Sequence, residues 1–585
     1  MTVSEDKRQE IRKRKEEWEE KTLAPALQKF GVQASPARFC SPLDVYDGDF
    51  LEKVGFPGEY PFTAGIYPSP APSAGPTRGG HVASGGTLVR AGRYSGYGTP
   101  EDTRDYYKLM MSKGQRTGPN IAFDLPTQCG YDSDHRIARG EVGKVGVAVD
   151  SLRDLEIIYE AFTGDMDLDK IASNWTINAP ASIIIAMYAA LADQRGIPRD
   201  QLRGTPQNDI LKEFESRGTY IYPPEPSMRL TRDVITYCTK HLPMLNTISI
   251  PGVHIREAGA TREQTLAFTL CNGMAYVQLG IDAGLDVDKF VQRMSFAGLG
   301  GTMEMLKEIA LNRASRRMWA KIMREKFKAK NPRSWLFRNI VAIAQGSAAT
   351  FTVERPLNNL TRSIIGGVCG ALCSDQVMVE PPYDETLELG PSMEAQQLNL
   401  DAARILQYEA KLTEVVDPFA GSYYIESLTD QIETDTWKII ENIEAMGGAV
   451  AAIENGHIQS EIARSAYQTQ RALETGEKII VGLNAFTGPE ELEVIPPRVV
   501  PHPYDPAKRA RAEQRQIENL RRLKKERDND QVCMSLLRLK QVAQDENANH
   551  LPVLIEAVKS YATVGEICDV FREVFGEYKT YGRAL

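Results

Sequence analysis

Between about residues 104 and 420, the chain alternates amphipathic stretches of helical period with short apolar runs. Apolar residues spaced three and four apart predict helices, and short apolar runs between turn signals predict buried strands. The helical stretches include 106–113, 151–162, 181–196, 232–242 and 263–284, and the strand-like runs include 119–127, 173–180, 246–255 and 290–296. Repeated strand–helix units with short connections favour an α/β fold whose parallel strands close into a (β/α)8 TIM barrel, with an open doubly wound sheet as the alternative.

The flanking regions are mainly helical. Residues 5–30 predict a charged helix with few apolar residues, which is either solvated or an arm that packs on another subunit. A Pro-rich break at 493–506 precedes a charged helix at 507–528 and two amphipathic helices within 551–578, separated by a Thr-capped turn. We therefore predict an N-terminal arm (1–45), a barrel domain (46–420), a helical continuation (421–490), and a linker with C-terminal helices (491–585).

Composition narrows the class of protein. The 585 residues are 42% hydrophobic, and 69 basic against 78 acidic side chains give a net charge of -9. These values indicate a globular protein and argue against binding to nucleic acid or an anionic membrane through overall charge. The N-terminus lacks a secretory signal and no apolar run reaches about 18 residues, so we expect a cytoplasmic protein. Of eight cysteines only Cys369 and Cys373 lie close together, which predicts reduced thiols and no metal site.

Polar clusters follow several predicted strands, where a barrel would place its active face. His254 follows the run 246–253 and offers an N–H that could polarise a carbonyl, although a lone histidine is as often structural. Arg217 closes a polar run that also holds Gln207, Asn208, Asp209 and Lys212. Its planar fork suits a carboxylate, and a surface ion pair is the simpler explanation from this segment alone.

Residues 56–99 are rich in Gly, Pro and Ser but carry several aromatic and basic side chains. A long irregular segment inside a compact domain is typically a functional loop, and a plain surface excursion is the alternative.

Eight phrases, in order from about residue 60 to 580, carry a resemblance to the methylmalonyl-CoA mutase family. They are YPFTAGIYP, AFDLPTQCGYDSDH, GTPQNDILKEF, RGTYIYPPEPSMR, ISIPGVHIREAGA, RMSF, DPFAGSYYIESLT and ATVGEICDVF. The resemblance implies a radical carbon-skeleton rearrangement of an acyl-CoA that depends on adenosylcobalamin, inside a TIM barrel with CoA along its axis. The family's cobalamin signature DxHxxG is absent from this sequence. The chain therefore resembles a large subunit that uses cobalamin carried by a separate small subunit, in a hetero-oligomer.

The resemblance also assigns roles to residues. Tyr94 is similar to a tyrosine at the boundary of cobalamin and substrate, and Gln207 and His254 are similar to groups that bond the thioester carbonyl. Arg217 resembles the arginine that pairs with a free substrate carboxylate. Expected CoA contacts are Arg90, Arg93, Arg293 and Ser295, and expected cofactor contacts are Gln128, Gln345 and Glu385.

Departures from the family pattern bear on the substrate. Val253 replaces an aromatic residue, 296–305 replaces an aromatic-rich stretch, Pro381 replaces an Asn near the adenosyl ribose, and Gln128 and Cys129 replace a His-Arg pair. Loss of aromatic volume should enlarge the pocket. Arg217 favours a dicarboxylic acyl group, because the isobutyryl- and 2-hydroxyisobutyryl-CoA enzymes usually carry Gln there. We expect interconversion of a substituted malonyl-CoA and a succinyl-CoA type thioester, bulkier than methylmalonyl-CoA.

The alternatives are methylmalonyl-CoA mutase itself, a 2-hydroxyisobutyryl- or isobutyryl-CoA type mutase, and a non-catalytic relative. A TIM-barrel enzyme that works without cobalamin would instead be active as this chain alone.

Overall fold

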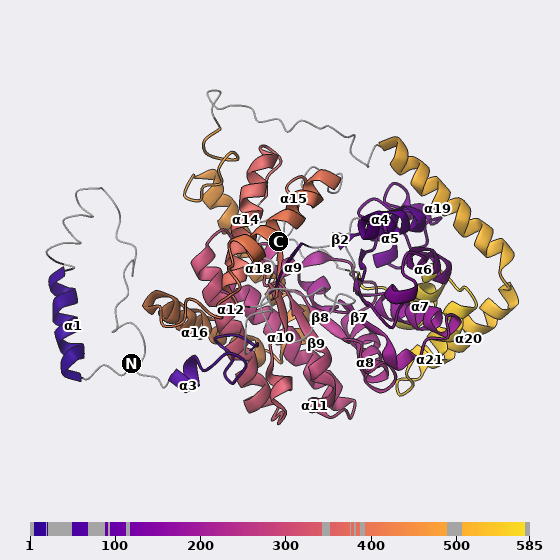
Figure 1. Cartoon of the computed structure of the whole chain (residues 1–585). Coiled ribbons are helices and arrows are strands. Elements are labelled where there is room, and N and C mark those ends of the chain that lie inside the picture. The colour runs from indigo at the N-terminus through magenta and orange to yellow at the C-terminus, as the bar shows by residue number, and fades with distance from the viewer. Residues whose placement is uncertain are drawn as a thin grey trace.

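The computed structural model describes residues 5–18, 20, 50–67, 88–91, 94–112, 118–341, 351–374, 376–379, 382–385, 392–487 and 506–579. Helix α1 (Glu5–Trp18) stands apart from the main body, and α3 (Phe50–Lys53) lies at its edge (Figure 1). Helix α1 covers the first part of the helix predicted at 5–30, and residues 21–30 lie outside the described residues.

The strands form parallel sheets. One has the order β1 (Leu88–Ala91), β11 (Gln376–Val379), β10 (Asn339–Val341), β9 (Met294–Ala297), β8 (Ile248–Ile250). The second has the order β2 (Tyr94–Ser95), β4 (Asn120–Ala122), β6 (Ala172–Thr176), β7 (Arg203–Pro206). A small third sheet pairs β3 (Tyr97–Gly98) with β5 (Gly146–Val147). The prediction of an α/β fold with parallel strands is confirmed.

The two larger sheets are hydrogen-bonded to each other along one edge. Between β7 and β8, the N–H of Asn246 donates to the carbonyl of Gly204, and the N–H of Ser249 donates to that of Gln207, each at 2.9 Å. At the opposite edges stand β1 and β2, which only two residues of the chain separate.

The prediction of an irregular segment across 56–99 was wrong for its last part, because β1 to β3 lie within it. Gly96 shows why glycine occurs there. Its φ is +150°, and a Cβ at this position would lie 2.0 Å from the carbonyl oxygen of Ala122 on the neighbouring strand. The glycine therefore permits close strand packing, and composition alone does not distinguish that from a loop.

Helices connect the strands, as the hydrophobic periodicity predicts. The longer ones are α4 (Pro100–Ser112), α6 (Leu152–Tyr159), α7 (Ala181–Gln194), α8 (Pro224–His241), α10 (Arg262–Asp282), α12 (Met305–Lys321), α14 (Pro356–Leu372) and α15 (Met393–Arg404). Short helices α5 (Leu125–Gln128), α9 (Val253–Glu257) and α11 (Val287–Phe290) follow or precede strands. Of the helices within the described ranges, none combines the length and hydropathy needed to cross a bilayer.

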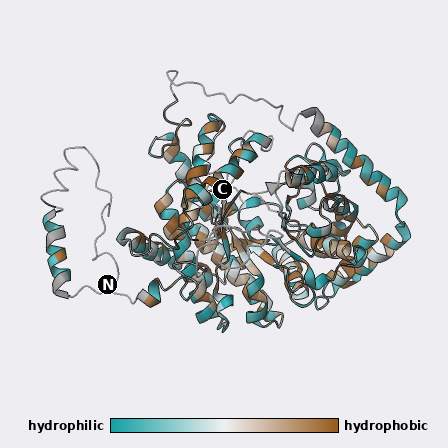
Figure 2. Cartoon of the chain, viewed as in Figure 1, coloured by the Kyte–Doolittle hydropathy of each residue, from teal (hydrophilic) through white to brown (hydrophobic). Residues whose placement is uncertain are grey.

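The C-terminal helices share the cores of the strand–helix region. Helices α16 (Tyr423–Ala445), α17 (Ala449–Glu454) and α18 (His457–Glu474) contribute to the core of α10 and α12. Helices α20 (Asn529–Gln544), α21 (Leu551–Lys559) and α22 (Val564–Phe575) join the core of α6 and α7. They lie beside those helices in space, and α19 (Pro506–Glu526), which precedes them, is predominantly hydrophilic (Figures 1 and 2).

The Thr-capped turn predicted before the last helix is confirmed. Thr563 accepts a hydrogen bond from the N–H of Glu566, and the Glu566 carboxylate accepts one from the N–H of Thr563. This reciprocal capping box fixes where α22 begins.

Candidate active site

Polar side chains gather where β6, β7, β8 and β11 end. Asn178 follows β6, Gln207 follows β7, His254 follows β8 and Glu385 follows β11. The carboxyl ends of parallel strands lie at one edge of a sheet, where ligands commonly bind. We call this edge the carboxyl edge and the opposite one the amino edge.

A hydrogen-bonded network fixes the side chain of Gln207. Its Oε1 accepts from Asn178 Nδ2 at 3.1 Å and from Lys212 Nζ at 3.2 Å. The same two donors reach Glu213 Oε1, at 2.6 Å and 2.5 Å respectively. With Oε1 turned into the protein, the amide NH2 of Gln207 has no hydrogen-bond partner among the described residues and can donate to a ligand.

Glu213 is the charged centre of this network. Its Oε2 accepts from the backbone N–H and the hydroxyl of Thr219, at 3.0 Å and 2.6 Å. Burial opposes ionisation, but the charges of Lys212 and Arg217 hold the pKa of Glu213 below its ordinary value. Burial in turn lowers the pKa of the fully buried Lys212 to about 8. The network therefore holds an ion pair inside the protein, which is costly unless every partner is in place.

Arg217 ends the π-helix η6 (Glu213–Arg217), and π-turns occur frequently at functional sites. Its Nη1 lies 3.6 Å from Glu213 Oε1, beyond hydrogen-bond distance, and is buried without an acceptor among the described residues. A guanidinium with an unfilled donor fits a carboxylate of a ligand.

His254 lies in α9, directly after the sharp turn at Gly252. The backbone of Gly252 is ordinary, but a Cβ there would lie 2.7 Å from Thr269 Oγ1, so close packing against α10 favours glycine. Burial and the charges of Lys212 and Arg217 hold the pKa of His254 well below its ordinary value. The imidazole is thus neutral near pH 7, and its buried Nδ1 has no partner among the described residues. A neutral imidazole in this position can donate one hydrogen bond to a carbonyl oxygen.

Two acidic side chains at the carboxyl edge have pKa values above the ordinary range. Burial raises the pKa of Glu257 to about 6. Burial, with the charges of Glu257 and Asp384, raises the pKa of Glu385 to about 7. Each carboxyl therefore holds its proton to a higher pH than usual, and a protonated carboxyl can donate as well as accept.

Gln128 ends α5 at the same edge. Its Nε2 donates to the carbonyl of Phe123 at 2.6 Å, and its Oε1 is buried with no donor among the described residues. The neighbouring Cys129 lies within the field of Glu213 and Arg217, and burial is the main reason that the pKa of its thiol rises to about 11. The structure thus brings together Gln128, Gln207, Arg217, His254 and Glu385.

The other predicted residues are placed differently. Arg293 directly precedes β9 and lies at the amino edge, and Ser295 is the second residue of the strand, so both lie away from Gln207. Arg90 lies in β1 and Tyr94 in β2, but their side chains are outside the described part of the chain. Arg93, Gln345 and Pro381 lie outside the described residues altogether.

The amino edge carries an arginine cluster that sequence analysis recognised only at Arg293. Arg203 and Arg338 stand at the starts of β7 and β10, and Arg333 lies nearby. Burial and mutual repulsion lower the pKa of Arg293, and the pKa of Arg338 falls to about 10 for the same reasons. None of the four forms an ion pair with a carboxylate of the described residues. The signal was present in the sequence as an Arg at the start of RGTP, RMSF and RNIV.

A row of accessible side chains connects the two edges. Arg203, Thr205 and Gln207 alternate along β7 and share one face, as do Arg293, Ser295 and Ala297 along β9. These residues are partly exposed, whereas the alternate residues of the same strands are buried. Asn174 on β6 is exposed, and Ile340 on β10 is 39% exposed. We call Asn174, Thr205, Ser295, Ala297 and Ile340 the accessible strip.

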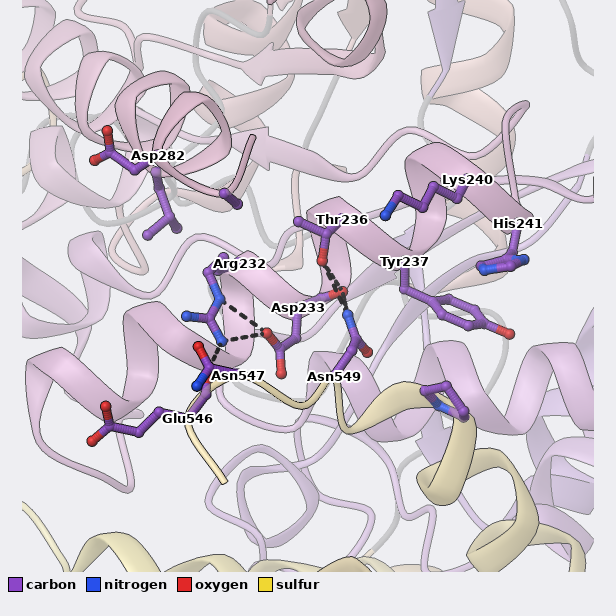
Figure 3. Close-up of a pocket in the computed structure, with 13 residues that line it drawn as sticks. Arg232, Asp233, Thr236, Tyr237, Lys240, His241, Asp282, Glu546, Asn547 and Asn549 are labelled. Atoms are coloured by element: carbon purple, nitrogen blue, oxygen red, sulfur yellow. Dashed lines mark hydrogen bonds and ion pairs between the residues drawn. The ribbon is translucent and has the colours of Figure 1, made fainter. Parts of the chain in front are cut away.

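A separate cavity of about 570 Å3 lies where the segment 546–552 meets α8 and the end of α10 (Figure 3). Arg232 donates to Asp233 and to the carbonyl of Glu546, and Asn549 donates to Thr236 at 3.0 Å. None of the predicted site residues lines this cavity. Within the described chain, no group of three or more His, Cys, Asp or Glu is arranged to hold a metal ion.

Comparison with known proteins places this geometry in a family. A model of the family "Methylmalonyl-CoA mutase" matches residues 38–577. The chain is 39% identical to the 2-hydroxyisobutanoyl-CoA mutase large subunit of Aquincola tertiaricarbonis, over 90% of this chain and 89% of the relative. It is also 39% identical to methylmalonyl-CoA mutase of Rhizobium meliloti (strain 1021), over 83% of this chain and 66% of that protein. It is 36% identical to the mitochondrial methylmalonyl-CoA mutase of Homo sapiens, over 90% of this chain and 66% of that protein. The chain therefore belongs to the methylmalonyl-CoA mutase family, and it is an isomerase that rearranges an acyl-CoA.

Proposed function

We propose that this chain is the substrate-binding large subunit of an adenosylcobalamin-dependent mutase for a dicarboxylic acyl-CoA. The reaction would interconvert a substituted malonyl-CoA and a succinyl-CoA type thioester. A hydrogen and the thioester-bearing group exchange places on neighbouring carbons, so composition and oxidation state do not change. Cobalamin would be carried mainly by a separate small subunit, as the name of the Aquincola relative suggests.

The proposed fold is one closed barrel with the accessible strip inside it. The order β1/β2, β4, β6, β7, β8, β9, β10, β11 gives eight consecutive parallel positions, supported by the bonds from β7 to β8 and by the proximity of β1 to β2 in sequence. TIM barrels are usually filled by large branched side chains. Small and polar residues such as Thr205 and Ser295 would instead leave room for a ligand chain along the axis.

Each part of an acyl-CoA then has a partner. The CoA phosphates would bind the arginine cluster at the amino edge, because four cations lack carboxylate partners there. The pantetheine arm would follow the accessible strip. Arg203 and Gln207 are four residues apart on β7, or about 13 Å. The thioester would then arrive at Gln207 and His254.

At the carboxyl edge, this chain's residues would orient and polarise the acyl group. The Gln207 amide and the neutral His254 would donate to the thioester oxygen, stabilising charge that builds up during migration without a full proton transfer. Arg217 would bind the free carboxylate through its unfilled Nη1. This unfilled donor is the observation that carries the choice of a dicarboxylic substrate, since the 3.6 Å ion pair with Glu213 leaves the buried Nη1 without a hydrogen-bond acceptor, and such a buried donor is costly.

The polar groups around this edge also fit the adenosyl end of the cofactor. The buried Oε1 of Gln128 lacks a donor, and Glu385 has a carboxyl able to bond sugar hydroxyls. Adenosylcobalamin supplies radical chemistry when bound, and the chain would contribute a closed surround that keeps water and stray hydrogen donors away.

A second candidate is 2-hydroxyisobutyryl-CoA, favoured by the 39% identity and 89% coverage of the Aquincola large subunit. The test mixes this chain with its cognate small subunit and adenosylcobalamin and offers a panel of thioesters. The panel holds methylmalonyl-CoA, bulkier substituted malonyl-CoAs, isobutyryl-CoA and 2-hydroxyisobutyryl-CoA. We expect the bulkier dicarboxylic thioesters to isomerise fastest. Preference for a monocarboxylic thioester would overturn the role of Arg217, and preference for methylmalonyl-CoA would overturn the enlarged pocket.

A further inference from the structure

Lys212 is a buried cation of the candidate active site, and the proposed function gives it no contact with the substrate. Its side chain is 0% exposed, and its ammonium contacts Gln207 Oε1 and Glu213 Oε1 only through the hydrogen bonds already described. Burying a cation disfavours folding unless its partners are exact, so this residue imposes a cost that a neutral side chain would avoid.

The hydrogen bonds around Lys212 indicate a role for its buried charge. Lys212 and Asn178 each donate to both Gln207 Oε1 and Glu213 Oε1. The four side chains therefore form a closed ring of hydrogen bonds. A primary amide offers an oxygen on one side and an NH2 on the other. A positive charge beside the amide selects the orientation in which the oxygen faces the charge. The NH2 of Gln207 then faces away from the network.

We infer that Lys212 is a positioning residue that holds the Gln207 amide with its NH2 directed at the substrate thioester oxygen. The inference rests on the proposed function, since Gln207 must bond the thioester for its orientation to matter. Lys212 also keeps a positive charge beside His254, which favours the uncharged imidazole as the second donor. One buried ammonium thereby acts on both donors: it bonds Gln207 together with Asn178, and it adds to the effect of burial on His254.

The primary test replaces Lys212 by Met, which is of similar length and cannot donate. In the reconstituted enzyme we expect kcat to fall about 10- to 100-fold, while KM changes less than about threefold. The reason is that a misdirected Gln207 amide would lose a hydrogen bond that is strongest in the transition state. The matched control is Lys321→Met, which removes a lysine on α12 that bonds Glu433 at 2.7 Å. The control should retain wild-type kcat.

A double-mutant cycle with Gln207→Met shows whether Lys212 acts through the amide. If it does, adding Lys212→Met to Gln207→Met costs little further kcat, within about threefold. Fully multiplicative losses would overturn the inference, because they would mean that Lys212 acts without Gln207.

A third measurement needs neither substrate nor cofactor. Histidine labelled for NMR, with His254 assigned from a His254→Gln variant, should titrate at higher pH in Lys212→Met than in wild type, because one of the two charges acting on it, those of Lys212 and Arg217, has gone. An unmoved titration in a folded variant would overturn the second part of the inference, the effect of Lys212 on His254. This readout stands even if no thioester is turned over, so failure of the proposed function and failure of this inference are distinguishable.

Lys212→Met leaves Glu213 as a buried charge and could unfold the chain. The variant Lys212→Met/Glu213→Gln removes both charges together and avoids that penalty. It should keep the fold and still lose kcat, because the amide of Gln207 has lost its ammonium partner. Wild-type kcat in this folded variant would overturn the inference.

Discussion

The two edges of the parallel sheets treat charge in opposite ways. At the carboxyl edge, the buried Lys212 is matched by Glu213, whose two carboxylate oxygens both accept hydrogen bonds. At the amino edge, Arg203, Arg293 and Arg338 lie together, and no carboxylate of the described residues pairs with them. The carboxyl edge is thus a network of paired charges with a few donors that lack partners. The amino edge is a cluster of positive charges without matching negative ones.

This difference suits each edge to a different part of the proposed acyl-CoA. A balanced network holds its side chains in fixed positions and can present single donors in fixed directions, which suits a reacting thioester. An unbalanced cluster is stabilised only when a polyanion arrives, which suits phosphate groups. Binding strength would therefore come mainly from the amino edge, and chemical selectivity from the carboxyl edge.

The largest effect is expected from Arg217→Gln at the carboxyl edge. Loss of a buried carboxylate–guanidinium pair should lower kcat/KM for a dicarboxylic thioester about 100- to 1000-fold. A monocarboxylic thioester should lose less than about tenfold, because it has no carboxylate to bind there. Steady-state assays of the reconstituted enzyme with both substrates measure the ratio. Equal losses of kcat/KM for both thioesters would show that Arg217 does not bind the substrate carboxylate.

Ser295→Trp tests whether the two edges are connected. The indole would fill the accessible strip and should lower kcat/KM about 100-fold by obstructing the pantetheine arm. Ser295→Ala is the matched control, since it removes only the 3.2 Å bond to the carbonyl of Ile248 and should cost less than about threefold. Circular dichroism checks folding. Normal turnover by a folded Ser295→Trp variant would rule out a ligand chain along the strip.

Arg293→Met/Arg338→Met tests the arginine cluster of the amino edge. We expect KM for the acyl-CoA to rise about 10- to 30-fold with kcat nearly unchanged, because phosphate contacts do not change during the rearrangement. Wild-type affinity should weaken with added salt, and that dependence should be smaller in the variant. The surface variant Arg464→Met serves as the control. A fall in kcat with constant KM would place the cluster in the chemistry instead.

Glu385→Gln gives the smallest expected effect, on stability. Burial raises the pKa of Glu385 to about 7, so the folded state binds a proton more tightly than the unfolded state does. This contribution is therefore present at pH 4.5 and is lost as pH rises to about 7. At pH 8, Glu385→Gln should raise the melting temperature by about 1 to 3 °C, and at pH 5 it should change little. Calorimetry at both pH values measures this; stabilisation only at pH 5 would reverse the sign and refute the buried carboxyl.

The sequence predicted the elements well where packing is repetitive. The periodic stretches 181–196 and 263–284 correspond to α7 and α10. A helix that packs on a core over its whole length has apolar residues at regular spacing, which the sequence shows directly. Residues 88–98 were interpreted as irregular because strands of two to four residues leave no period, and their glycines serve backbone contacts across strands.

The candidate site was predicted unevenly for a similar reason. Gln207, His254 and Arg217 were recognisable through local phrases of the chain. Asn178 and the arginine cluster depend on neighbours far away in sequence: Asn178 meets Gln207 across 29 positions. Lys212 was visible, yet its role depends on complete burial, which a single sequence does not reveal.

The π-turn that carries Arg217 has a consequence for how acyl selectivity could change. A π-turn contains one residue more than the α-turn it replaces, and each residue of a helix advances the side-chain direction by about 100°. Deleting Ser216, which lies between Glu213 and Arg217, would therefore turn the guanidinium to a new direction while keeping both of these residues in the sequence. Homologues could thus diverge in the acids they accept through a change of chain length, so an enzyme engineer should vary insertions and deletions here as well as side chains.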